Sequence, residues 1–205
     1  MNKLFVSLLL TLGVAGVASA AQPIKGDAAA GQAKTAVCGA CHNPDGNSLA
    51  PTFPKLAGQG ERYLEKQLHD IKTGKRTVLE MTGMLEGLND QDLADIAAYF
   101  ASQKGSVGAA DPTLVERGRA LFNGGDLDKG MPACTGCHSP NGAGLELAGF
   151  PHLSGQHAQY VGKQLTDFRE GNRTNDGDAM TMRTIAAKLS NKDIEAVSSY
   201  IQGLH

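Results

Sequence analysis

The chain has 205 residues, a formal net charge of −2 at pH 7 and no Trp, and only 5% of its residues are aromatic. A mildly acidic sequence without a basic run lacks the electrostatic footprint of a nucleic-acid-binding protein, so nucleic acid is excluded as a partner. Small domains with so few aromatic side chains bury little apolar area through their own residues.

The pattern of residues 1–20 is typical of a secretory signal peptide. Lys3 supplies an early positive charge, an apolar run extends to about Val17, and small residues form a cleavage site that ends at Ala20. The apolar run is short for a membrane span, although an uncleaved N-terminal anchor is the alternative. We predict cleavage after Ala20 and export of the remaining 185 residues.

Helical periodicity dominates the first half of the exported chain, and no alternating strand pattern stands out. A helix is predicted over 27–37, and a Cys-x-x-Cys-His motif follows directly at 38–42. Gly31 is expected to let this first helix cross the last helix of the half closely. A middle helix is predicted whose one face consists of Tyr63, Leu64, Gln67, Leu68 and Ile71. A last helix is predicted whose one face consists of Leu93, Ile96, Ala97 and Phe100.

The second half of the chain repeats the first. Residues 151–174 align with 54–77 without a gap at an offset of 97, and the Cys-x-x-Cys-His motif recurs 96 residues later at 134–138. The last helices correspond at an offset of 101, and a helix containing Gly118 precedes the second motif. Two long repeats indicate duplicated domains, each with its own core, because a solenoid needs three or more short units.

The predicted fold class is therefore all-α, with two small helical domains in tandem. The joint lies in a stretch rich in small residues near 102–113, where Asp111 can cap the next helix and Pro112 can occupy its first turn. The predicted boundaries are 21–105 for the N-terminal domain, 106–112 for the linker and 113–205 for the C-terminal domain.

Each Cys-x-x-Cys-His motif is a signal for the covalent attachment of a c-type haem. The two thiols add across the vinyl groups of the porphyrin as thioethers, and the turn between them separates the sulfurs by about the vinyl spacing. The adjacent His then lies over the ring, where it can bind iron. We predict two haem c groups. Cys38 and Cys41 attach the first, and His42 is its fifth iron ligand. Cys134 and Cys137 attach the second, and His138 is its fifth iron ligand.

Three other uses of the cysteines remain. A zinc site could combine the two pairs, but it does not require a His after each pair. A redox dithiol would need a neighbouring strand and helix, which the pattern lacks. Disulfides are compatible with export. The haem interpretation is favoured because the motif occurs twice at matching places, and because two porphyrins would also fill cores that are short of aromatic side chains.

The sixth iron ligand decides between electron transfer and chemistry on a small molecule, because Met in that position gives an electron-transfer iron of raised potential. Leu88 corresponds to Leu189 in the repeat, and seven residues before each of them stands a Met. These two, Met81 and Met182, are the predicted sixth ligands. The alternative is that both merely fill gaps in the core.

The other methionines fit the repeat less well. Met84 aligns with Ile185 and Met180 aligns with Leu79, so each is Met in one half only. Met84 and Met180 are therefore kept as second choices for the sixth ligand. Met131 lies just before the second cysteine pair, on the side of the ring that the His occupies, and it is set aside.

Two further pairs of matched residues each have two interpretations, one as part of a haem site and one without such a role. The carbonyl groups of Pro54 and Pro151 could accept the N–H of the haem-binding imidazoles, or these residues could be ordinary loop prolines. Arg76 and Arg173 could pair with haem propionates, or they could lie in solvent. The histidines without a repeat partner are expected at the surface or in loops, and they are His69, His152, His157 and His205.

The signal peptide, the two haem motifs, the Pro-x-Leu-x-Gly-Gln stretches and the late Met of each half resemble the di-haem cytochrome c4 family over residues 21–205. The resemblance implies two class I cytochrome c domains whose haem propionates meet at the interface. It also implies a monomeric periplasmic carrier, loosely associated with the membrane in some members, that passes electrons from a cytochrome bc complex towards a terminal oxidase. Small periplasmic redox proteins are further expected partners.

Two rival functions remain beside a carrier without catalytic residues. One is a di-haem enzyme of the peroxidase or thiosulfate-oxidising type, which would need an exchangeable or unusual sixth ligand. The other is the haem subunit of a flavoprotein dehydrogenase. The sequence has no Gly-rich nucleotide fingerprint, so a flavin would have to be held by another chain.

Overall fold

A computed structural model describes residues 24–205, so the predicted signal peptide lies outside the described residues. The described part is helical, and its only β-type pairing consists of two isolated bridges. The helices of the first half are α1 (Ala28–Lys34), α2 (Gly39–His42), α3 (Glu61–Lys72), η1 (Leu79–Met81) and α4 (Asp90–Ser102). Those of the second half are α5 (Val115–Gly124), η2 (Leu127–Lys129), α6 (Thr135–His138), η3 (Glu146–Ala148), α7 (Ala158–Glu170), α8 (Thr181–Ala186) and α9 (Asn191–Gly203).

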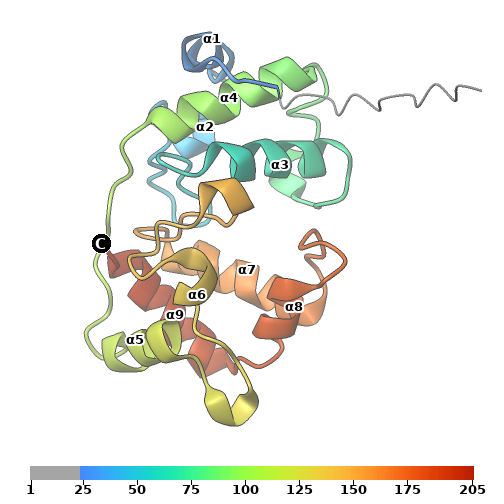
Figure 1. Cartoon of the computed structure of the whole chain (residues 1–205). Coiled ribbons are helices and arrows are strands. Elements are labelled where there is room, and N and C mark those ends of the chain that lie inside the picture. The colour runs from blue at the N-terminus through green and yellow to red at the C-terminus, as the bar shows by residue number, and fades with distance from the viewer. Residues whose placement is uncertain (1–23) are drawn as a thin grey trace, which may run out of the picture.

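The two halves stack on one another and are built alike (Figure 1). In the first half α1 and α3 both pack on α4, and in the second half α5 and α7 both pack on α9. Each half has its own apolar core, which forms around Ile96 and Phe100 in the first and around Phe122 and Val197 in the second. The predicted all-α fold with two separate cores is thus confirmed.

The last helix of each half begins at a capping box, which explains why the chain turns into helix there. Asn89 and Ser190 each accept a hydrogen bond from a backbone N–H three residues later, and the Asp at that later position bonds back. Two orphan N–H groups are satisfied at each helix start, and the Asp carboxylates also favour the positive end of the helix dipole.

The first and last helices of each half cross at a glycine, as the sequence predicts. A Cβ on Gly31 would lie 2.0 Å from the carbonyl oxygen of Asp95, and a Cβ on Gly118 would lie 2.3 Å from the carbonyl oxygen of Ala196. No side chain fits at such a distance, so these positions fix how closely the helices approach.

Gly118→Ala is expected to lower the free energy of unfolding by roughly 1–3 kcal/mol, because the new methyl group forces α5 away from α9. The measurement is denaturant unfolding of the holoprotein. Gly124→Ala in the same helix is the matched control, since no atom lies within 4 Å of a Cβ at that position. Equal stability of the two variants would contradict the packing argument.

The linker runs along one side of the molecule between the halves (Figure 1) and is fixed at its far end. Gly108 donates its N–H to the carbonyl of Gln202 at 3.0 Å, and the Gln202 side chain donates to the carbonyl of Ala109 at 2.8 Å. The backbone N–H of Asp111 bonds to the hydroxyl of Ser199. The connecting segment is therefore attached to α9 and does not hang free.

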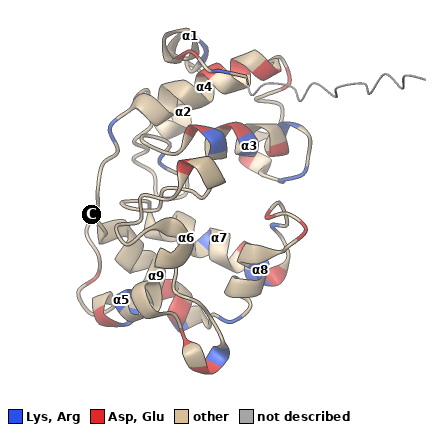
Figure 2. Ribbon diagram, viewed as in Figure 1, with Lys and Arg blue, Asp and Glu red and all other residues tan. Residues whose placement is uncertain are grey.

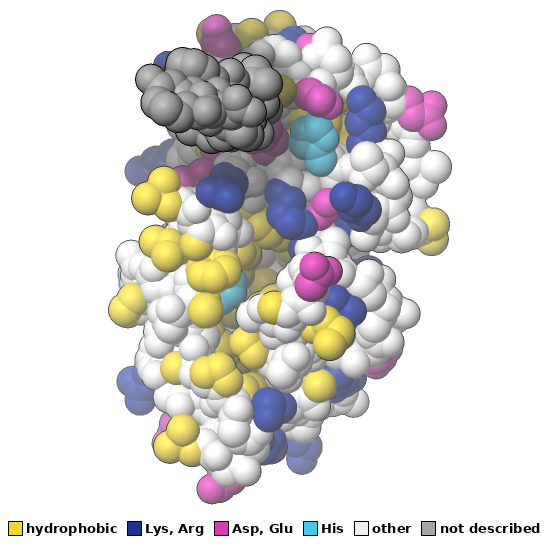
Figure 3. Space-filling view, turned by 45° about the vertical axis from the view of Figure 1, so that its right-hand side comes forward, with side chains coloured by type: hydrophobic (Ala, Val, Ile, Leu, Met, Phe, Trp, Pro, Cys, Tyr) yellow, Lys and Arg dark blue, Asp and Glu magenta, His cyan; other side chains and the backbone are white. Residues whose placement is uncertain are grey.

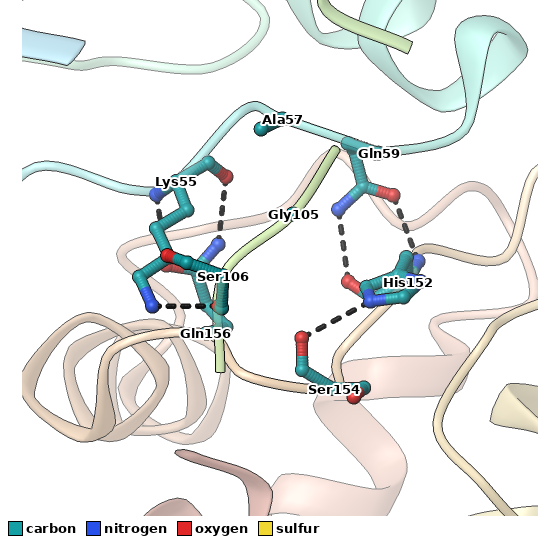
Figure 4. Close-up of a pocket in the computed structure, with 8 residues that line it drawn as sticks. All are labelled: Lys55, Ala57, Gln59, Gly105, Ser106, His152, Ser154 and Gln156. Atoms are coloured by element: carbon teal, nitrogen blue, oxygen red, sulfur yellow. Dashed lines mark hydrogen bonds between the residues drawn. The ribbon is translucent and has the colours of Figure 1, made fainter. Parts of the chain in front are cut away.

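The halves meet through two matching sets of hydrogen bonds. They are made by the side-chain amides of Gln59 and Gln156, which are 97 residues apart and occupy equivalent positions in the repeat. Gln59 donates to the carbonyl of His152 at 2.9 Å and accepts its N–H at 2.7 Å. Gln156 donates to the carbonyl of Lys55 at 2.9 Å and accepts its N–H at 2.9 Å. Figure 4 shows both pairs around a small hollow. Because the same contact is made in both directions, the two halves are related by an approximate twofold rotation.

The surface carries both signs of charge. Lys and Arg alternate with Asp and Glu over both halves, without a continuous basic stripe in the ribbon view (Figure 2). On one face, apolar side chains gather over the second half and near the boundary between the halves (Figure 3). Among the described residues, no helix is both long and apolar enough to cross a membrane.

Candidate haem sites

Both Cys-x-x-Cys-His motifs form a single helical turn, α2 and α6. The backbone N–H of His42 bonds to the carbonyl of Cys38 at 3.0 Å, and that of His138 bonds to the carbonyl of Cys134 at 2.9 Å. This local hydrogen bond closes the turn that sets the two sulfurs apart and leaves the His next to the second Cys. The motif geometry predicted from the spacing is present in both halves.

The imidazoles of His42 and His138 are buried, with exposed fractions of 7% and 8%. Nδ1 of His42 lies 2.8 Å from the carbonyl oxygen of Pro54, and Nδ1 of His138 lies 3.0 Å from that of Pro151. The contact with the proline carbonyls, one of the two interpretations, is therefore confirmed.

This contact determines which ring nitrogen can bind a metal. A carbonyl oxygen only accepts, so Nδ1 must donate and, in the neutral ring, Nε2 keeps a free lone pair. Burial lowers the pKa of both His42 and His138, while the hydrogen bond to the proline carbonyl opposes that effect. Burial thus favours the neutral imidazole that a metal requires.

The four cysteines lie in the two motif turns, where Cys41 is exposed and the other three are partly buried. Cys38 and Cys134 are partly buried and pack against the apolar core of their own half. Burial raises the pKa of the Cys38 thiol and raises that of Cys134 to about 11. No disulfide joins these thiols, and residues 24–205 contain no cluster of three or more His, Cys, Asp or Glu that could hold a metal ion. The residues present therefore fit two tethered haems better than a shared zinc site.

The methionines differ in burial in a way that favours the predicted pair. Met81 ends η1 and Met182 lies in the first turn of α8, and both are partly buried. Met84 and Met180 are 50% and 49% exposed. Met131 is buried in the core of the second half. Met81 and Met182 are less exposed than Met84 and Met180, and only this pair is matched in the repeat, so Met81 and Met182 stay the predicted sixth ligands.

Arg76 and Arg173 do not lie in solvent, so that interpretation is wrong. They are 9% and 8% exposed, and both guanidinium groups lie between the halves. Each donates to the same two amide oxygens, those of Gln67 and Gln164, at 2.9 Å.

The two arginines also reach the tyrosine of the other half. Arg76 donates to the hydroxyl of Tyr160 at 2.9 Å, and Arg173 donates to that of Tyr63 at 3.1 Å. Within the described residues neither guanidinium forms an ion pair with a carboxylate. Two positive charges are thus buried side by side among neutral oxygens, which is costly unless an anion joins them.

Some residues at this boundary were not predicted from the sequence. His152 and His157 lie in loops, as expected, but their contribution to the contact between the halves was not predicted. Nε2 of His157 lies 2.9 Å from the carbonyl oxygen of Ser48. Asn175 also crosses the boundary. The only signal for it in the sequence is that it lies where the two repeats differ in length.

Known proteins with similar sequences and structures agree with this geometry. The sequence model of the cytochrome c family matches residues 28–104 and 115–205. Cytochrome c4 of Pseudomonas aeruginosa is 77% identical over 205 residues, 100% of both chains. The crystal structure of reduced recombinant cytochrome c4 from Pseudomonas stutzeri is 74% identical with a TM-score of 0.87, covering 88% of this chain and 100% of that one. The thiosulfate dehydrogenase electron acceptor of Stutzerimonas stutzeri is 34% identical over 168 residues, 80% of this chain and 76% of that one.

Two helical domains, each with a haem-attachment turn and an oriented imidazole, define a c-type cytochrome with one covalently bound haem c per domain. It is an electron-transfer protein and not an enzyme. Within this class, the chain belongs to the di-haem cytochrome c4 family. Its redox partners are other proteins.

Proposed function

We propose that the chain is a periplasmic carrier that passes single electrons from a cytochrome bc complex towards a terminal oxidase. The observation that carries the proposal is that each half fixes one imidazole through Nδ1 and holds one partly buried Met at a matched position. When bound, each haem c supplies the one-electron exchange between ferrous and ferric iron. The proposed ligands are His42 with Met81 and His138 with Met182.

The residues of the chain keep each metal site rigid. The proline carbonyls fix the plane and basicity of the imidazoles, and Met81 and Met182 would hold the remaining position of each iron, so that a small molecule would find no open site. Little rearrangement is then needed when the charge on the iron changes, which suits transfer without chemistry. The soft thioether favours the ferrous state and raises the potential.

The buried arginines support a further part of the proposal. Arg76 and Arg173 lack a carboxylate partner among the described residues, and haem propionates would supply the missing anions at the boundary between the halves. The acceptor and donor haems would then approach each other there. Tyr63 and Tyr160 offer hydroxyl groups in the same place.

The proposed processing and domain limits follow the sequence. The signal peptide is removed after Ala20, the domains span 21–105 and 113–205, and 106–112 connects them. The family matches at 28–104 and 115–205 fall inside these limits. The mature protein is proposed to be a monomer with at most loose peripheral association with the membrane. Exposed apolar side chains on the second half, such as Leu127 and Leu147, are suited to brief contacts with small periplasmic redox proteins and other partners.

Carbon monoxide distinguishes the carrier from a di-haem enzyme. We expect the reduced protein to bind no carbon monoxide at neutral pH, because sulfur occupies the sixth position of both irons. The measurement is the optical spectrum of the reduced protein before and after the gas is added. Rapid binding at either haem would favour an enzyme with an open site. A relative is named as the electron acceptor of a thiosulfate dehydrogenase, so thiosulfate oxidation by a partner is the second candidate context.

A further inference from the structure

The loop that carries Met182 is longer than its counterpart. The repeats are 97 residues apart at Thr77 and Thr174 but 101 apart at Met81 and Met182, so the second half has four extra residues in between. In this longer loop Asn175 forms hydrogen bonds across the boundary, whereas the described hydrogen bonds of residues 78–84 all stay inside the first half.

Within the loop, Asp176 holds the start of α8. Its carboxylate accepts the backbone N–H of Arg183 at 2.9 Å and the Nε–H of the same residue at 2.7 Å. The Arg183 guanidinium also donates to the carbonyls of Thr174 and Gly177. Met180, at the N-cap position of α8, provides no side-chain cap. Asp176 therefore takes over the capping role and ties the loop to the turn that contains Met182.

The neighbouring residue, Asn175, ties the same loop to the first half. Its Nδ2 donates to the Asp70 carboxylate at 2.7 Å and to Oε1 of Gln67 at 2.9 Å, and both partners are buried on α3. Its carbonyl accepts from Nζ of Lys66 at 2.8 Å, also on α3. Arg173 donates to its Oδ1 at 2.9 Å. One side chain and its backbone thus connect the loop to α3 at three points, and Arg173 holds the same side chain from within the second half.

Among the described residues, the first half has no equivalent of this connection. Asp167, the repeat counterpart of Asp70, pairs through its side chain with Lys163 alone among the described residues. The η1 helix that contains Met81 has no side-chain cap. Between residues 78 and 84, the described hydrogen bonds all stay inside the first half. The two Met loops therefore differ in how firmly they are held.

We propose that Asn175 is a positioning residue that fixes the Met182 loop to α3, so that the sulfur of Met182 is displaced from iron less easily than the sulfur of Met81. The inference rests on the proposed ligand assignment. It also gives a physical reason why two haems with the same ligand types should behave differently. Opening of the second loop must break a hydrogen bond to a buried carboxylate, whereas opening of the first loop breaks no bond across the boundary.

The test is a titration of the oxidised holoprotein with free imidazole, which competes with a Met sulfur for iron. In a Met81→Ala background the remaining sulfur-to-iron band reports Met182 alone, and in a Met182→Ala background it reports Met81 alone. Asn175→Ala is expected to lower the imidazole concentration that displaces Met182 by about tenfold, the size expected for a hydrogen bond to a charged group. The concentration that displaces Met81 should not change.

Two further variants separate this role from general loosening of the boundary. Asn175→Asp keeps the shape but places a second carboxylate against Asp70, so it should weaken the Met182 site at least as much as Asn175→Ala. Arg62→Ala removes a different bond between the halves, the one from Arg62 to the carbonyl of Leu147, and should leave both midpoints unchanged.

The outcomes distinguish the two proposals. If Asn175→Ala behaves like the wild type, or if Arg62→Ala has the same effect as Asn175→Ala, the positioning role is refuted. If Met182→Ala instead leaves the sulfur-to-iron band at full strength, the ligand assignment fails independently of Asn175.

Discussion

Replacing either Met81 or Met182 with Ala should remove about half of the weak sulfur-to-iron absorption band of the oxidised protein, and replacing both should remove all of it. Each substitution takes away one thioether, and the vacant position then accepts water in the ferric state and carbon monoxide in the ferrous state. The reduction potential of the affected haem should fall, because the thioether favours ferrous iron. Optical spectra and redox titrations of the three variants measure both effects.

The exposed methionines provide the controls for this experiment. Met84→Ala and Met180→Ala should retain the full band, because both side chains are about half exposed and neither is matched in the other half. Loss of half the band in Met84→Ala would move the ligand of the first haem to Met84. Loss of half the band in Met180→Ala would move the ligand of the second haem to Met180.

Arg76→Gln or Arg173→Gln should lower the reduction potential of the protein and weaken the contact between the halves. Each substitution removes a buried positive charge, which favours the ferrous state when it lies near a haem. The expected fall is of the order of 60 mV, equivalent to a tenfold change in a one-electron equilibrium. The remaining oxygens of Gln67, Gln164 and one tyrosine also lose a donor.

A redox titration and thermal unfolding of the Arg variants measure these two effects. Arg119→Gln is the matched control, because it removes the same charge from an exposed position on α5. It should change neither the potential nor the melting temperature appreciably. A potential that is unchanged in Arg76→Gln and Arg173→Gln would mean that these charges do not act on the haems.

The parts of the fold that depend on local patterns could be predicted from the sequence. The helices, the closed turns at the two motifs and the crossing at Gly31 and Gly118 each depend on spacing within one segment or on the repeat. The repeat also indicated the two proline carbonyls, because Pro54 and Pro151 follow the haem-binding histidines at nearly equal distances.

The boundary between the halves could not be predicted in the same way. Its bonds join residues that are about a hundred positions apart, and no local periodicity encodes such a pairing. Gln59 and Gln156 were visible as a matched pair, but their partners are backbone groups of two residues with different side chains, Lys55 and His152. The role of Asn175 depends on a length difference whose path through space is set by tertiary structure.

The attachment of the linker to α9 has a consequence for how the two halves stay together. Covalent connection makes the association of the halves intramolecular, with a high effective concentration, so their polar contacts can hold them together at any protein concentration. The alignment of the two redox centres therefore does not depend on how much protein the compartment holds. A carrier assembled from two separate chains would lose that alignment as it became scarce.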